Sequence, residues 1–262
     1  MNILKQIVKT KTEEVNMSKE TVSIEMLKQI NQFGRSCLSL SQMLKEEGKP
    51  KVIAEFKRKS PSKEAINLDA NPSEIAEAYE KGGASAISVL TDEQYFGAQS
   101  DDIQIVRATT NLPILRKDFI IDSYQLYEAK AMGADVVLLI AEVLSKPQII
   151  DLISHAHDLG LEVLLEIHSK KQIGKCMSGA DIIGVNNRNL ETFTTHIDSS
   201  LELINFLPGD MPAISESGIH KIEDAQTLFD AGYKGFLIGE YFMQAENPQV
   251  AIHEFLNGIT VR

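Results

Sequence analysis

The sequence has no tryptophan and only two cysteines among its 262 residues. Cys37 and Cys176 form no Cys-x-x-Cys pair and show no Cys/His spacing that suits zinc. This scarcity argues against a disulfide framework and a structural zinc site, and it favours a reduced compartment. We expect both cysteines to be packing residues. His155 and His157 are two positions apart on an expected helix, where they face different directions, so they do not predict a metal pair.

Long hydrophobic runs and an excess of basic residues are also missing. No apolar run approaches the ~20 residues that a membrane-spanning helix needs, and the N-terminal stretch has no signal-peptide core. Lys and Arg number 26 against 37 Asp and Glu, which gives a net charge of −11. Nucleic acid is a poor match as a partner, because its binding requires many basic side chains. We expect a cytoplasmic protein without membrane contact, in which any phosphate site is local.

What the sequence does have is a repeated unit after residue 50. Short apolar runs alternate with longer amphipathic segments, and several runs follow a glycine turn such as KGGAS or AMGAD, which is how a helix ends before the next strand. Apolar spacing in residues 1–49 predicts two further helices. The eight predicted strands are residues 52–56, 85–90, 113–116, 135–140, 162–167, 181–185, 212–215 and 235–239.

Eight repeats of helix, glycine and buried strand predict an α/β fold, a single (β/α)8 TIM barrel. Nearly continuous apolar strands that alternate with helices indicate a parallel sheet covered on both faces. An open doubly wound sheet more often has five or six strands, and no GxGxxG motif follows any strand. We therefore expect one domain over residues 1–262, with residues 1–49 as an N-terminal helical extension and residues 50–262 as the barrel.

Charged and polar residues follow the predicted strands unevenly. In such barrels the active site lies at the carboxyl ends of the strands, so these residues are expected to converge on one rim. Taken singly, each is more often a solvated loop residue. Together they favour a site that binds an anion and moves protons, with lysine pKa values lowered and glutamate pKa values raised by burial. The residues are Glu55, Lys57, Lys59, Lys117, Glu166, Asn186, Arg188, Glu216 and Ser217.

Strand alternation and loop glycines add detail to this site. Glu55 and Lys57 lie on the same side of their strand, toward the barrel interior if Ile53 points there. Gly218 and Gly239 follow the last two strands, where backbone N–H groups can cradle a phosphate. The loop aromatics Tyr95 and Phe96 fit either walls around a flat substrate or a cover over the core. His168, just past Glu166, fits surface or supporting packing better than catalysis.

The chain resembles the indole-3-glycerol phosphate synthase family over essentially its whole length. The resemblance implies ring closure of 1-(2-carboxyphenylamino)-1-deoxyribulose 5-phosphate, with release of carbon dioxide and water, in tryptophan biosynthesis. It implies a lyase that uses no cofactor and no metal. The motifs that carry it, in the family's order, are EFKRKSPS, LTDEQYF, LRKDFIID, LLEIH, GVNNRNL, SESGI and LIGE.

The resemblance also implies roles for individual residues. Lys117 would be the general acid that protonates the substrate carbonyl, and Glu166 the general base of the later dehydration. Lys57 would hold the anthranilate carboxylate and share in proton transfer, while Glu55 and Asn186 position these groups and Glu216 and Arg188 complete the site. The phosphate grip would include Lys59, Ser60, Gly218 and Gly239, and the aromatic walls would be Phe96 and Phe119. Ser217 and Glu240 are expected to be further substrate-binding residues.

Two positions depart from the family pattern, and two other functions stay open. Glu64 stands where the family usually has glycine, and Tyr241 stands where a small residue is more usual. A phosphoribosylanthranilate isomerase has the same fold but needs a cysteine base after the first strand, where this chain has Lys57. A phosphosugar-binding barrel without catalysis is the second alternative. We expect a small anionic phosphosugar as ligand, and a monomer or weak oligomer.

Overall fold

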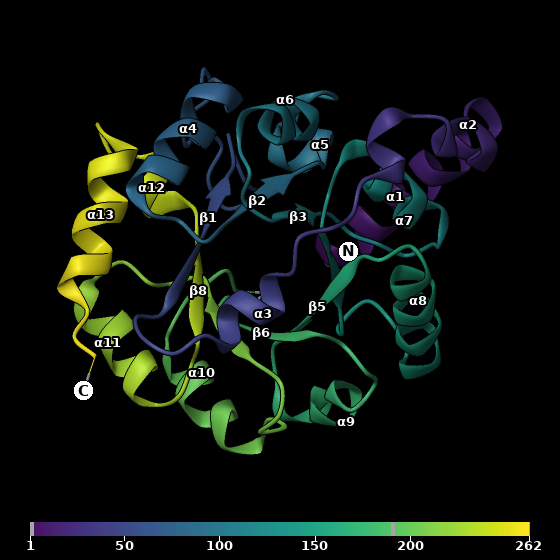
Figure 1. Cartoon of the computed structure of the whole chain (residues 1–262). Coiled ribbons are helices and arrows are strands. Elements are labelled where there is room, and N and C mark those ends of the chain that lie inside the picture. The colour runs from purple at the N-terminus through teal and green to yellow at the C-terminus, as the bar shows by residue number, and fades with distance from the viewer. Residues whose placement is uncertain (1–2, 190–191, 262) are drawn as a thin grey trace.

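Eight parallel strands form a closed barrel in the order of the sequence, with β8 pairing back to β1 (Figure 1). The structure is a computed structural model that describes residues 3–189 and 192–261, so Leu190 of the GVNNRNL motif lies outside the described residues. The predicted (β/α)8 barrel is confirmed, and each strand lies within two residues of its predicted bounds. The strands are β1 (Lys51–Phe56), β2 (Ala86–Leu90), β3 (Ile114–Lys117), β4 (Val136–Ile140), β5 (Glu162–Ile167), β6 (Ile182–Asn186), β7 (Ala213–Glu216) and β8 (Gly235–Ile238).

Helices surround the barrel and precede it. Gly83 and Gly133 end helices in the left-handed conformation with φ of 95° and 91°, which confirms that glycine turns separate helix from strand. The α-helices are α1 (Ile3–Thr21), α2 (Ile24–Lys28), α3 (Leu40–Lys45), α4 (Pro72–Gly82), α5 (Glu93–Phe96), α6 (Asp102–Thr109), α7 (Tyr124–Met132), α8 (Lys146–Asp158), α9 (Ile173–Cys176), α10 (Asp198–Leu203), α11 (Ile222–Asp230), α12 (Glu240–Met243) and α13 (Pro248–Gly258). Three short 3-10 helices are η1 (Asn31–Gly34), η2 (Lys170–Gln172) and η3 (Ile204–Phe206).

The N-terminal extension holds more helices than the sequence predicted. The two expected helices are α1 and α2, but α3 also precedes the barrel. Its six residues are too few for a periodic apolar pattern, and its local signal is the Ser39 side chain, which accepts a hydrogen bond from the Gln42 backbone N–H. The prediction of two helices was therefore incomplete.

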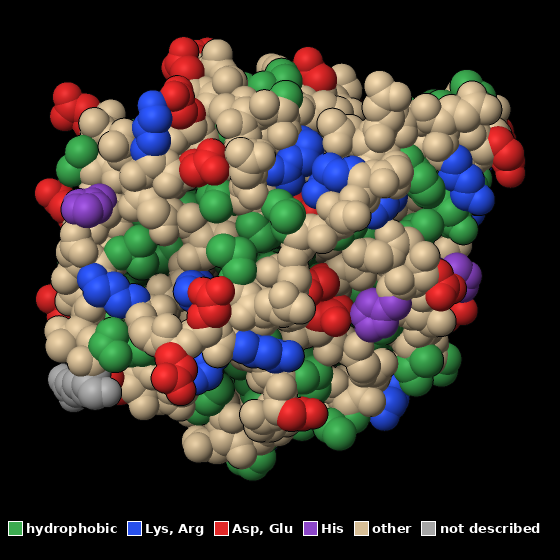
Figure 2. All heavy atoms as spheres, in the orientation of Figure 1, with side chains coloured by type: hydrophobic (Ala, Val, Ile, Leu, Met, Phe, Trp, Pro, Cys, Tyr) green, Lys and Arg blue, Asp and Glu red, His purple; other side chains and the backbone are tan. Residues whose placement is uncertain are grey.

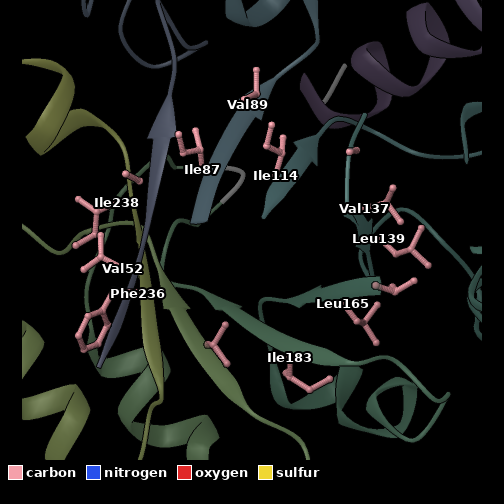
Figure 3. Close-up of a cluster of buried hydrophobic side chains, with 14 of the residues drawn as sticks. Val52, Ile87, Val89, Ile114, Val137, Leu139, Leu165, Ile183, Phe236 and Ile238 are labelled. Carbon is pink, nitrogen blue, oxygen red and sulfur yellow. The ribbon is translucent and has the colours of Figure 1, made fainter. Parts of the chain in front are cut away.

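The hydrophobic core has two layers because strand side chains alternate between the two faces of the barrel wall. Outward-pointing residues such as Val52, Ile87 and Phe236 pack toward the surrounding helices (Figure 3). Inward-pointing residues, including Ile53 and Leu164, form a separate buried cluster inside the barrel. Since Ile53 belongs to the inner cluster, Glu55 and Lys57 are directed to the interior side, as predicted.

Helix α3 closes the amino end of the barrel, where it crosses in front of the strands in Figure 1. Leu40 and Leu44 of α3 belong to the inner cluster and are almost fully buried. A Cβ atom on Gly235, at the start of β8, would lie 2.7 Å from the Lys51 carbonyl oxygen and 2.9 Å from the Leu44 side chain, so glycine is required there for both to approach. The amino end is thus packed solid, and the cavity lies at the other end.

The outer surface fits the acidic composition. On the face drawn in Figure 2, the described residues show acidic and basic side chains interspersed rather than one extended basic area. In the part of the chain that the structure describes, no helix is long and apolar enough to span a membrane.

Candidate active site

A cavity of about 160 Å³ lies at the carboxyl ends of the strands. Leu138, Ile140 and Leu237 supply apolar surface to it. The structure brings most of the predicted site residues together on its walls: Glu55, Lys57, Ser60, Phe96, Lys117, Phe119, Glu166, Asn186, Arg188, Glu216, Ser217, Gly218 and Glu240. Lys59 and Gly239 are the two predicted residues that are not part of this lining.

Lys117 lies at the centre of the charged groups. Its Nζ donates a hydrogen bond of 2.9 Å to Glu166 Oε2 and lies 3.3 Å from Glu216 Oε2. Burial alone would lower the pKa of Lys117, but the charges of Glu166, Glu216 and Glu55 outweigh burial and raise it. The expectation of a lowered lysine pKa was therefore wrong for Lys117. Its ammonium is protonated before substrate arrives, as a general acid must be.

The two carboxylates beside Lys117 differ in their proton affinity. Burial raises the pKa of Glu166, but Lys117, His168 and hydrogen bonds outweigh burial and lower it, so Glu166 is ionised. Burial raises the pKa of Glu216, with only partial opposition from Lys117. Glu216 is 1% exposed, and neither of its carboxylate oxygens has a hydrogen-bond partner within the described residues. The expectation of a raised glutamate pKa was right for Glu216 and wrong for Glu166.

Glycines make room for the carboxylates. A Cβ atom on Gly239 would lie 2.6 Å from Glu55 Oε1, and one on Gly184 would collide with Glu216 Oε1. Glu55 in turn accepts a hydrogen bond of 2.5 Å from Lys57 Nζ. Gly239 therefore acts on the site through Glu55, because a larger residue would displace that carboxylate. Gly184, in the middle of β6, was not predicted, since a glycine inside a strand carries no sign of what approaches it.

Asp118 was missed by sequence reasoning, although it lines the cavity next to Lys117. Its Oδ1 lies 3.0 Å from Lys11 Nζ, and its Oδ2 lies 3.1 Å from Arg116. Burial raises the pKa of Asp118, but Arg116 and Lys11 outweigh burial and lower it to about 2. Since Lys11 also lies 3.1 Å from Asp92, this buried network ties α1 to the loops after β2 and β3.

The loop after β7 has the backbone expected of an anion site. Ser217 and Gly218 are both left-handed, with φ of 65° and 73°. This conformation is strained for serine, and Asn187 Nδ2 holds it by donating to the Ser217 carbonyl at 3.1 Å. Such turns expose backbone N–H groups that bind anions. Both residues line the cavity.

The loop after β1 lies on the same side of the cavity. A tight turn from Ser60 to Lys63 is closed by two backbone hydrogen bonds of 2.9 and 3.0 Å. Lys63 Nζ lies 2.6 Å from Glu240 Oε1, which fixes the turn to the start of α12. Lys59 Nζ instead donates to the Gln94 carbonyl at 3.0 Å, away from the cavity lining. Lys63 was not predicted, because a lysine in a loop is usually a solvated residue.

Apolar walls come from the aromatic loops and the N-terminal helix. The rings of Phe96 and Phe119 have centroids 6.2 Å apart and both line the cavity. Ile3, Leu4 and Ile7 of α1 also line it, and no sequence pattern showed where this helix would dock. Tyr95 hydrogen-bonds Thr10 of α1 at 3.0 Å, outside the cavity lining. Of the two loop aromatics, only Phe96 is therefore a wall residue.

Neither departure from the family pattern distorts the site. Glu64 is exposed and is not among the described residues with a positive φ, so its position does not require glycine. Tyr241 lines the cavity and packs with its ring centroid 5.4 Å from that of Phe242. Within the described part of the chain, no group of three His, Cys, Asp or Glu side chains is arranged to hold a metal ion.

The family model for indole-3-glycerol phosphate synthase matches residues 4–255. The chain belongs to the indole-3-glycerol phosphate synthase family. An indole-3-glycerol phosphate synthase of Bacteroides thetaiotaomicron is 47% identical over 98% of this chain and 99% of the relative. One of Carboxydothermus hydrogenoformans is 44% identical over 97% and 99% of the two chains. The family prediction is confirmed, and with it the prediction of a lyase of tryptophan biosynthesis.

A solved structure supports the architecture independently. Thiamine phosphate pyrophosphorylase from Pyrococcus furiosus superposes with a TM-score of 0.60, covering 79% of this chain and 94% of that one. Its sequence identity is 18%, so the likeness shows the barrel fold alone.

Proposed function

We propose that this chain closes the indole ring of 1-(2-carboxyphenylamino)-1-deoxyribulose 5-phosphate, with Lys117 as general acid and Glu166 as general base. The observation that carries the proposal is the Lys117 ammonium held between two buried carboxyl groups, Glu166 and Glu216, in a cavity with apolar walls. A positioned ammonium can protonate a carbonyl and a positioned carboxylate can accept a proton, and the reaction needs both operations. Family membership supports the same reaction.

The two anionic ends of the substrate find complementary groups at separate places on the cavity wall. Lys57 and Arg188 are cationic lining residues that can attract the anthranilate carboxylate. The turn at Ser217 and Gly218 and the loop at Ser60 form the phosphate end. Phe96 and Phe119 provide apolar surface for the aromatic ring of the substrate, which lies between its two anionic ends. Lys59 would join the phosphate end by turning its ammonium away from the Gln94 carbonyl.

Ring closure begins at the ketone. Lys117 donates a proton to the carbonyl oxygen while the ring carbon that bears the carboxylate attacks the carbonyl carbon. The aromatic ring becomes an iminium, which then accepts the electron pair of the breaking C–CO₂ bond and regains aromaticity. No cofactor is needed in this scheme because the substrate supplies its own electron sink.

Dehydration completes the indole. Glu166 accepts a proton from the carbon next to the ring nitrogen and passes it to the new hydroxyl, which leaves as water. The lowered pKa of Glu166 keeps it ionised and ready to accept this proton. Asn186 contributes a hydrogen bond to Glu166, which supports its predicted positioning role.

The alternatives find less support. The isomerase needs a cysteine base, but no cysteine is among the described residues that line the cavity. Cys176 is buried in α9, and Cys37 donates weakly to the Ala134 carbonyl outside the barrel. A non-catalytic barrel would have no use for three buried carboxyl groups around two lysines, an arrangement that costs folding free energy. A monomeric or weakly associated protein of the cytoplasm, without nucleic acid, remains our proposal.

The test is a fluorescence assay with the purified chain and the carboxyphenylamino substrate. The product carries an indole, and the absence of tryptophan gives the protein a low background at the same wavelengths. We expect indole fluorescence to rise in proportion to enzyme concentration. Conversion to other products, or none, would contradict the proposal.

A further inference from the structure

The proposed reaction consumes one proton per turnover, and this proton has to reach a buried site. The substrate carboxylate leaves as neutral carbon dioxide, and the carbonyl oxygen leaves as water with two added protons. One of these is balanced by the proton removed from the carbon beside the ring nitrogen. The other proton has to come from solvent, since no other group of the substrate releases a proton in the reaction.

The groups that handle protons are nearly cut off from solvent. The side chains of Lys117, Glu166 and Glu216 are 12%, 4% and 1% exposed, and bound substrate would cover the cavity mouth as well. After one reaction Lys117 has given up its proton. It can act again only after a proton has entered from outside.

His168 lies where such a path would pass. Its Nε2 is 3.4 Å from Glu166 Oε1, and its side chain is 10% exposed. Neither ring nitrogen has a hydrogen-bond partner within the described residues. The backbone N–H of His168 donates to Gln172 Oε1 at 2.7 Å, which fixes the residue just past β5. An imidazole ring can accept a proton on one nitrogen and donate one from the other, and within the described residues neither nitrogen of His168 is committed to a hydrogen bond.

His168 lines a second cavity of about 360 Å³. Apart from Leu4, the described residues that line it have polar or charged side chains, among them Glu142, Ser169, Asn187, His196 and Ser199. His168 lines the second cavity and not the first, whereas Glu166 lines the first and not the second. Leu4, Asn186 and Arg188 line both cavities, so the cavities adjoin, and the contact between His168 and Glu166 links a residue of one wall to a residue of the other.

We propose that His168 is a proton relay, which carries protons from the second cavity to Glu166 and through it to Lys117. The inference rests on the proposed function, and it makes His168 a residue that acts through Glu166 rather than on substrate. His168 passes a proton from the second cavity to Glu166, and Glu166 hands that proton across its 2.9 Å hydrogen bond to Lys117, which leaves Glu166 ionised again. The charged and titratable groups around the relay are Glu166 on β5, Lys117 on β3, Glu216 on β7, Glu142 after β4, and Arg188 and His196 after β6.

Pre-steady-state kinetics distinguish a relay from a packing residue. The first turnover uses the proton already stored on Lys117, and only later turnovers need the relay. In His168→Gln and His168→Ala we expect a first turnover at the wild-type rate, followed by steady-state turnover about 10- to 100-fold slower, within the range of proton-transfer effects. Added imidazole should raise the steady-state rate of His168→Ala at constant pH and ionic strength.

His157→Gln is the matched control, because His157 is a half-exposed histidine that contacts Asp181 far from the cavity lining. It should match the wild type in both phases. The relay is refuted if the His168 variants slow the first turnover as much as later ones, or if their steady-state rate equals that of the wild type. Absence of product from the wild type would refute the proposed function instead, so the two failures are distinguishable.

Discussion

The two ends of strand β5 carry glutamates with opposite environments. Glu162, at the amino end, accepts hydrogen bonds of 2.5 to 2.9 Å from the side chains of Ser39 and Ser41 and from the backbone N–H groups of Leu40 and Ser41. Glu166, four residues later, contacts Lys117 and His168. The same residue type therefore stabilises the fold at one end of the barrel and is kept reactive at the other.

The difference extends beyond these two residues. At the amino end Leu44 fills the barrel, and Lys51 has a carboxylate partner in Glu46 at 2.7 Å. At the carboxyl end Glu216 is buried, and its carboxylate oxygens have no hydrogen-bond partner among residues 3–189 and 192–261. Buried polar groups are normally paired, so incomplete pairing confined to a cavity indicates function rather than stability. Substitutions at the two ends should accordingly separate activity from folding.

The largest effect is expected for Lys117→Met, which removes the proposed general acid while keeping a long side chain. We expect the turnover number to fall by about 10²- to 10⁴-fold, with a much smaller change in substrate affinity. Lys51→Met at the amino end is the matched control and should leave the turnover number unchanged. Steady-state kinetics of both variants check this, and near-wild-type turnover for Lys117→Met would remove Lys117 from the role.

At the opposite end, Leu44→Ala should lower stability without lowering the turnover number. It leaves a cavity against Gly235 in the barrel interior, a change that costs about 2 to 5 kcal/mol of unfolding free energy. Leu68→Ala, at a leucine that is 54% exposed, is the control and should leave stability nearly unchanged. Urea unfolding measures the stability of both variants. A large loss of turnover in folded Leu44→Ala would contradict the claim that the amino end affects stability alone.

A smaller effect is expected for Lys59→Ala, because Lys59 is proposed to bind the remote phosphate rather than the reacting atoms. Loss of a charge-assisted contact of roughly 1.5 to 3 kcal/mol should raise the Michaelis constant. Inorganic phosphate should inhibit the variant more weakly than the wild type. Equal inhibition constants for phosphate would show that the grip depends on the Ser217–Gly218 turn and the Ser60 loop alone.

A fourth effect concerns the pH dependence of stability. Because burial raises the pKa of Glu216, the unfolded chain loses this proton at lower pH than the native protein does. Native stability should therefore fall as pH rises above the ordinary carboxyl range, by about 1.4 kcal/mol per unit of pKa difference. Glu216→Gln should lack this part of the decline. Urea unfolding at pH 5 and pH 8 compares the stability of the wild type with that of the variant. The same pH dependence of stability in both proteins would contradict the raised pKa of Glu216.

The local sequence pattern was sufficient to predict the barrel fold, because each strand is a short apolar run and several are preceded by a glycine that ends a helix. It also located Lys117 and Glu166, since parallel strands bring their carboxyl ends to one rim. It could not show that α1 would dock over the cavity through Lys11, because that contact joins residues more than 80 positions apart. Long-range contacts leave no periodic mark in the sequence.

The pKa expectations failed for a related reason. Burial of a side chain can be predicted from the apolar residues near it in the sequence. The net shift of its pKa, however, depends on which charges face one another in three dimensions. Lys117 faces Glu166 and Glu216, so its pKa rises where burial alone would lower it. Gly184 shows the same limit, since the reason for a glycine at this position is the Glu216 carboxylate that approaches it from the next strand.

The central claim is that the carboxyl end of the barrel carries the reaction while the amino end stabilises the fold. Its most direct test is single-turnover kinetics of Glu166→Gln beside Glu162→Gln. An amide cannot accept the proton removed during dehydration, so Glu166→Gln should release carbon dioxide while indole fluorescence lags far behind, with a decarboxylated, hydroxylated intermediate accumulating. Glu162→Gln should lose stability but form carbon dioxide and indole together at the wild-type rate. Synchronous release of both products by Glu166→Gln at the wild-type rate would contradict the assignment of Glu166 as the base.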